Sequence, residues 1–131
     1  MTPYGYGVTK GSQTYDMGAY GSATGGVPFE FVCPDDQVVT GIFGRDGTLI
    51  DNLQVTCSSL VVDGATPGGY TVRTGASTSS PRWADETGGG DFRYDCPDGY
   101  AVAWLWGSWD PAQSDLISRI GVSCSQVLIR P

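Results

Sequence analysis

A turn followed by an apolar strand carries the carboxylate that is best placed for chemistry. Residues 47–51 read GTLID, and Asp51 is the only charged residue between Asp46 and Asp63. An ionised carboxylate at the end of a stiff strand can accept hydrogen bonds from two neighbouring hydroxyl groups of a ligand. Capping of its own turn is the other role open to Asp51, and the residue pattern taken alone favours that role.

Two further groups of residues could take part in binding. Glycine clusters at 25–26 and 88–90 would let a ligand approach the backbone closely, because glycine has no side chain. A loop near residue 110 combines carboxylates with Trp109, whose indole could stack on a ligand. The first candidate site comprises Gly47, Thr48, Leu49, Asp51, Gly88, Gly89 and Gly90. A second candidate site comprises Gly25, Gly26, Trp109, Asp110 and Asp115.

The composition is that of a small all-β domain. The chain has 131 residues, with 20 glycines and 8 prolines, which fits one domain of short strands joined by tight turns. Its net charge of −7 makes nucleic acid and anionic membranes unsuitable partners. No apolar run approaches the length of a membrane span, so membrane insertion is not expected.

The cysteines and the missing histidines narrow the chemistry further. The chain has 4 cysteines and no histidine, which excludes Ser-His-Asp and Cys-His catalysis and zinc sites with histidine ligands. Disulfides are favoured over buried free thiols, and they indicate an oxidising, extracellular compartment. The acids are scattered, without the spacing of a calcium loop. We therefore expect no metal and no cofactor.

The chain contains an internal duplication. Cys33-Pro34-Asp35 recurs as Cys96-Pro97-Asp98, and the apolar run at 38–43 recurs at 101–106. Ile50, Val55 and Cys57 recur as Ile117, Val122 and Cys124, at a larger offset because the second copy has extra residues around 109–112. We predict one domain over 1–131, with an N-terminal edge segment (1–24), repeat one (25–60), connecting strands and a loop (61–88), and repeat two (89–127).

The duplication also predicts local structure. Each copy has one cysteine near its first strand and one at the end of its last strand, so a pairing local to each repeat joins Cys33 to Cys57 and Cys96 to Cys124. Residues 74–81, rich in serine and threonine, are predicted to be a flexible loop. Trp104 and Trp106 share one face of an apolar strand and are predicted to lie in the core.

The repeats resemble the jacalin-related lectins. A glycine cluster that leads into an aromatic strand, followed by a Gly-Arg-x-Gly-x-x-Ile-Asp turn (residues 44–51), carries the likeness. The Cys-Pro start and Cys end of each unit are closer to bacterial secreted repeats and to egg vitelline outer-layer proteins. The resemblance implies a β-prism I-like fold of antiparallel Greek-key sheets, with sugar bound by loops at one end.

The resemblance also implies a division of roles. Its sugar-binding Gly-x-x-x-Asp motif matches Gly47 to Asp51, beside the glycine cluster at 88–90, and with this likeness sugar binding becomes the favoured role for Asp51. In the second copy Ser118 replaces Asp51 and Ser114 replaces Gly47, which puts a standard second site in doubt. Members of this family that bind galactose resemble one another in having a free N-terminal glycine at the site. Both glycine clusters here are preceded by other residues, so the resemblance favours mannose or glucose configuration over galactose.

Three function classes remain in view. The favoured one is an extracellular carbohydrate-binding module that is not an enzyme. The alternative is a disulfide-stabilised structural or assembly protein of a coat, fibre or toxin. A glycosidase needs only two carboxylates, but most acids here stand in turns, where solvation explains them. The sequence leaves a homo-oligomer open.

Overall fold

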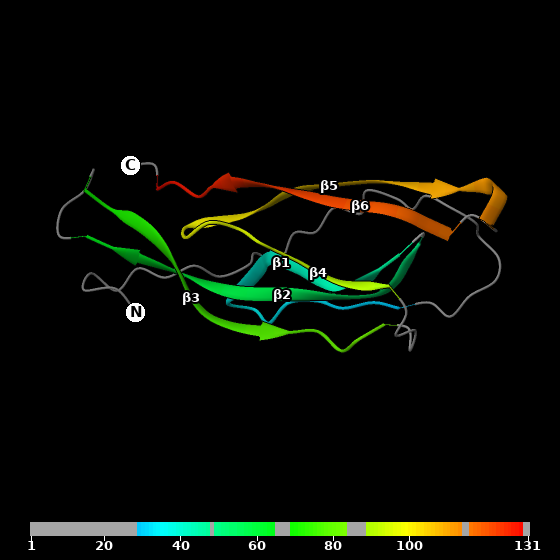
Figure 1. Cartoon of the computed structure of the whole chain (residues 1–131). Coiled ribbons are helices and arrows are strands. Elements are labelled where there is room, and N and C mark those ends of the chain that lie inside the picture. The colour runs from blue at the N-terminus through cyan, green and yellow to red at the C-terminus, as the bar shows by residue number, and fades with distance from the viewer. Residues whose placement is uncertain (1–28, 48, 65–68, 84–88, 114–115, 130–131) are drawn as a thin grey trace.

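The computed structural model describes residues 29–129 except for 48, 65–68, 84–88 and 114–115 (Figure 1). The elements are β1 (Gln37–Asp46), β2 (Ile50–Asp63), β3 (Thr71–Ser79), β4 (Gly90–Asp95), β5 (Tyr100–Asp110), the 3-10 turn η1 (Pro111–Gln113) and β6 (Leu116–Gln126). The described part is all-β and contains no α-helix, as the glycine-rich composition predicts. Within it, no helix is long and apolar enough to cross a membrane.

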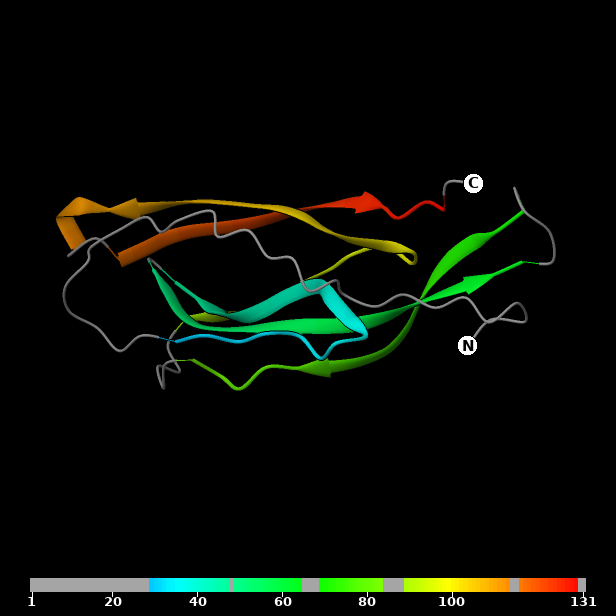
Figure 2. The same cartoon turned by 180° about the vertical axis from the view of Figure 1, so that it is seen from behind.

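The strands form two antiparallel sheets. The larger sheet has the order β3-β2-β1-β4, which is a Greek key because the fourth strand returns to lie beside the first. The smaller sheet is the β5–β6 hairpin. Both views place this hairpin over one face of the larger sheet, and β1 contacts both of its strands (Figures 1 and 2). Strand β4, from repeat two, therefore completes the sheet of repeat one.

The two hairpins have the same strand register, as expected for two copies of one unit. Gln37 pairs with Ser59 in the first hairpin, and its counterpart Tyr100 pairs with Gln126 in the second. Each hairpin has two register shifts. They fall between Val39 and Gly41 and between Arg45 and Asp46 in β1, and at the matching positions of β5. Such bulges bend a strand and re-aim its side chains, so the copies share their backbone irregularities as well as their pairing.

The start of repeat one departs from this symmetry. Strand β4 carries Phe92 opposite Gly44 of β1. The matching residues 29–32 form no strand, and Phe29 instead stacks on Trp83, with ring centroids 4.4 Å apart. Trp83 in turn bridges to Leu53 of β2. Among the described residues, the aromatic strand expected at the start of each copy is therefore present in repeat two and absent from residues 29–32.

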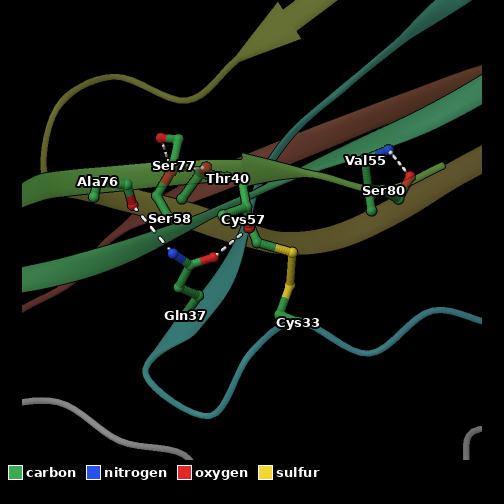
Figure 3. The surroundings of a disulfide bond; sticks show 10 residues. Cys33, Gln37, Thr40, Val55, Cys57, Ser58, Ala76, Ser77 and Ser80 are labelled. Atoms are coloured by element: carbon green, nitrogen blue, oxygen red, sulfur yellow. Dashed lines mark hydrogen bonds between the residues drawn. A yellow bond between two sulfur atoms is a disulfide. The ribbon is translucent and has the colours of Figure 1, made fainter.

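One disulfide and several hydroxyl groups hold the centre of the larger sheet. Both predicted disulfides are present, Cys33–Cys57 and Cys96–Cys124, each with a Cα–Cα distance of 5.8 Å. Beside the first, Ser58 shares hydrogen bonds with Thr40 at 2.6 Å and with Ser77 at 2.7 Å, across three strands (Figure 3). The buried apolar residues are few: Cys33, Ile42, Cys57, Leu60 and Val62. The hydroxyls of Thr40 and Ser58 can be buried here because each has a hydrogen-bond partner.

The loop prediction for residues 74–81 is wrong over most of its length. Residues 74–79 belong to β3, which pairs with β2. Side-chain hydrogen bonds add to the pairing, including one of 2.6 Å donated by the Thr78 hydroxyl to the side-chain oxygen of Gln37. Serine and threonine are typical of loops when they bond to their own backbone. Here they bond across strands, so they support a sheet.

Candidate functional site

Asp51 lies at a β-bulge. Arg45 pairs with Asn52 and Asp46 pairs with Ile50, so Asp51 is the extra residue on β2 and has no partner on β1. The turn that joins the strands is tight, because Gly47 donates its backbone N–H to the carbonyl of Leu49 at 2.9 Å. A bulged residue points its side chain away from the regular alternation of the strand. The bulge explains how a carboxylate can stand in an apolar strand without facing the core.

Backbone from both repeats borders the Asp51 carboxylate. The Oδ2 atom lies 2.8 Å from the point where a Cβ on Gly89 would stand, and 3.6 Å from the corresponding point on Gly47. Gly89 has a φ of +69°, a conformation that favours glycine, and a Cβ there would also overlap the carbonyl of Asp46. Around the neighbouring Gly90, no atom lies within 4 Å of the Cβ position. The carboxylate is thus half-buried between two glycines, one from each repeat.

Arg45 ties the two loops together. Its Nη2 donates a 2.8 Å hydrogen bond to the carbonyl of Gly89, and its Nη1 donates one of 2.8 Å to Oδ1 of Asp91. Strand pairing continues this contact, because Asp46 of β1 pairs with Gly90 of β4. The planar guanidinium is suited to holding two acceptors at once. The position of Gly89 relative to Asp51 is therefore set by β1 itself.

The proximity that the repeat order predicts is present for the residues that the structure describes. Asp51, Gly47 and Gly89 come together, Gly90 follows in β4, and Leu49 is half-buried in the turn. Sequence reasoning missed Arg45 as the residue that joins the loops. The pattern Gly-Arg-x-Gly contained it, but pairing an arginine with a carbonyl from the other repeat requires the strand register. Two residues predicted for this site, Thr48 and Gly88, lie outside the described residues.

The second candidate site is only partly described. Trp109 is 45% exposed, while the Asp110 carboxylate accepts a 2.9 Å hydrogen bond from the backbone N–H of Ala112. Asp110 therefore caps the start of η1, a common structural role for aspartate. At the position of Asp51, the hydroxyl of Ser118 donates to the carbonyl of Ser108 at 3.4 Å. Gly25, Gly26 and Asp115 lie outside the described residues.

The prediction that Trp104 and Trp106 are core residues is wrong. Their exposed fractions are 59% and 44%, and Leu105 between them is 63% exposed. Sequence reasoning assumed that an apolar run is covered on both faces. In repeat one, β2 and β4 flank β1, whereas among the described residues β5 pairs only with β6. The run is therefore apolar without being enclosed.

Metal binding and similarity to known proteins give no further assignment. No group of three or more His, Cys, Asp or Glu side chains among the described residues could hold a metal ion. Comparison with protein-family models, with curated proteins and with solved structures finds no match to this chain.

Proposed function

We propose that this chain is an extracellular carbohydrate-binding module that recognises sugar hydroxyls through Asp51. The observation that carries the proposal is the setting of this carboxylate, at a bulge between Gly47 of repeat one and Gly89 of repeat two. A carboxylate that only capped its own turn would need no contact with the backbone of the other repeat. The missing side chains of these two glycines let the backbone of both turns approach the carboxylate closely.

The chemistry of the site suits a polyol. An ionised carboxylate accepts hydrogen bonds and donates none, and its two oxygens can accept from two adjacent hydroxyls. Gly47 and Gly89 border it with bare backbone, so backbone groups can complete the recognition. Rigid strands and the Arg45 contacts hold the parts in place, which limits the entropy lost on binding.

The finer parts of the proposal follow the likeness to jacalin-related lectins. We infer a β-prism I-like arrangement, which the Greek-key order of the larger sheet supports for one of its sheets. We also infer a preference for mannose or glucose configuration. The two disulfides support a secreted location, because such bonds persist in oxidising compartments. Hydroxyl recognition needs one carboxylate, whereas glycoside hydrolysis needs a flanking pair, so we propose binding without catalysis.

One observation favours a second candidate function. The exposed aromatic side chains of β5 would suit an assembly surface in an extracellular coat, fibre or toxin. In that case the Asp51 site would be a remnant of an ancestral binding loop. Sedimentation velocity would detect such self-association, and a glycan array would remain blank.

A glycan array on wild type, Asp51→Ala and Asp51→Asn tests the proposal. Hydrogen bonds to a charged group contribute about 1.5–3 kcal/mol each, so losing two should weaken binding by more than about a hundredfold. Asp51→Asn should also lose most binding, because one acceptor becomes a donor. Asp46→Ala removes an exposed carboxylate from the same turn and is the matched control. Normal binding by Asp51→Ala, with an unchanged circular dichroism spectrum, would leave Asp51 as a turn residue.

A further inference from the structure

The second hairpin exposes a row of indoles that the proposed site does not use. Trp104 and Trp106 share one face of β5, with exposed fractions of 59% and 44%, and Trp109 further along the strand is 45% exposed. Contiguous exposed apolar side chains on a small domain mark an interaction surface more often than chance exposure. Because the two hairpins share one register, each residue of β5 can be compared with its counterpart in β1. Strand β1 pairs with β4 along the edge that corresponds to the outer edge of β5.

Trp104 differs most from its counterpart in the first hairpin. Its counterpart in repeat one is Gly41, next to the matching register shift. Strand β4 passes so close to Gly41 that a Cβ there would stand 2.6 Å from the carbonyl oxygen of Tyr94 and 2.9 Å from Oδ1 of Asp95. An indole at this position would collide with any strand that paired as β4 does. Trp104 therefore blocks strand addition at the outer edge of β5, whether the strand comes from residues 29–32 or from a second copy.

Trp106 is held in a fixed orientation. Its indole lies directly over Gly121 of β6, where a Cβ would stand 2.5 to 2.6 Å from two of the ring atoms. The guanidinium carbon of Arg119 lies over the same ring, 5.2 Å from its centroid. In repeat one the counterpart Phe43 is covered by Arg93 from β4, at 4.7 Å. A pre-ordered aromatic side chain loses little freedom when a ligand binds.

The surface around the indoles is almost uncharged, and this favours an uncharged ligand. Residues 104–109 and 117–123 carry a single charged side chain, Arg119, in a chain of net charge −7. A second copy, a nucleic acid and an anionic membrane would all add negative charge and be repelled. By alternation Ser108 shares the face of Trp104 and Trp106, and Ser123 lies opposite Trp104. Aromatic faces beside small hydroxyl groups match an uncharged pyranose, which offers a C–H face and hydroxyls together.

The strand that carries this surface runs toward the end of the molecule that carries Asp51. The β1–β2 turn and the β5–β6 turn lie at the same end in both views (Figures 1 and 2). Trp109 stands at that end, opposite Ile117. We propose that the exposed edge of β5, with Trp104 as its stacking platform, is a second carbohydrate-binding site for neutral oligosaccharides. It rests on the proposed function for the class of ligand, but uses none of the residues around Asp51.

Affinity electrophoresis in native gels that contain soluble mannan, galactomannan or β-glucan tests this site. Trp104→Ala should weaken retardation by about three- to tenfold, the range of one aromatic stacking contact. Trp104→Tyr should keep most of it. Leu105→Ala is the matched control, because it removes an equally exposed side chain that points to the other face of the strand. In an Asp51→Ala background, the retardation that remains should be removed by Trp104→Ala.

Other results would overturn one or both of the proposed sites. If Asp51→Ala abolishes retardation and Trp104→Ala changes nothing, the second site is wrong and the proposed function stands. If Trp104→Ala abolishes it and Asp51→Ala binds as wild type, the β5 site stands and the role of Asp51 falls. No retardation of wild type by any of the three polysaccharides would overturn both. Sedimentation velocity on the same variants covers the remaining case: a lower mass for Trp104→Ala would make this surface an interface between copies and overturn the proposal.

Discussion

Adding one methyl group at Gly89 should destabilise the protein, and adding one at Gly90 should not. Alanine at Gly89 would have to adopt a φ of +69°, which costs about 1–2 kcal/mol for a residue with a Cβ. The new Cβ would also overlap the carbonyl of Asp46 and stand 2.8 Å from Oδ2 of Asp51. Relieving such crowding costs about 1–3 kcal/mol. Gly89→Ala should therefore lower the free energy of unfolding by about 2–5 kcal/mol.

Urea denaturation and calorimetric sugar titration would measure the two effects separately. Gly90→Ala should change stability by less than about 0.5 kcal/mol, because its Cβ would meet no atom within 4 Å. Sugar affinity should fall more than about tenfold in Gly89→Ala, since the crowding acts on the ligand-binding carboxylate itself. Equal stabilities for the two variants would refute the geometry of the loops. A destabilised Gly89→Ala with wild-type affinity would instead refute the role of Asp51.

Three further substitutions test the frame around the site. Arg45→Ala should change stability by less than about 1 kcal/mol, because the ion pair is exposed, yet weaken sugar binding severalfold in titration calorimetry. Unchanged affinity would mean that the hydrogen bond from Arg45 is not needed to position Gly89. Replacing Cys33 and Cys57 together by alanine should lower the free energy of unfolding by about 3 kcal/mol in urea, and a loss below about 1 would contradict the loop-closure estimate. Ser58→Ala leaves the buried hydroxyl of Thr40 without this partner and should cost about 1–3 kcal/mol in thermal unfolding; no shift in midpoint would mean that water replaces the bond.

The duplication explains why so much of the fold could be read from the sequence. Cysteines at matching positions gave the disulfide pairing, because only one connectivity is local to each copy. The proximity of Gly89 to Asp51 followed from the order of the repeats. These inferences depended on residue types at fixed intervals. They needed no knowledge of how individual side chains pack.

The errors arose where packing decides the outcome. Residues 74–79 read as a loop by composition, but hydrogen bonds from β2 make them a strand. Trp104 and Trp106 read as core by hydropathy, but no described strand covers the outer edge of β5. In each case the deciding partner is distant in the chain, so local patterns could not reveal it.

The two hairpins share the same strand pairing but differ in the side chains at two key positions. Gly41 admits β4 to the first hairpin, and Trp104 excludes a strand from the second. At the second register shift, Asp51 presents a carboxylate to the other repeat, whereas Ser118 bonds to its own hairpin. A change at either position alters what can lie against the hairpin without altering its pairing. The shared register thus allowed one repeat to present a carboxylate at a junction between repeats and the other to present an aromatic edge.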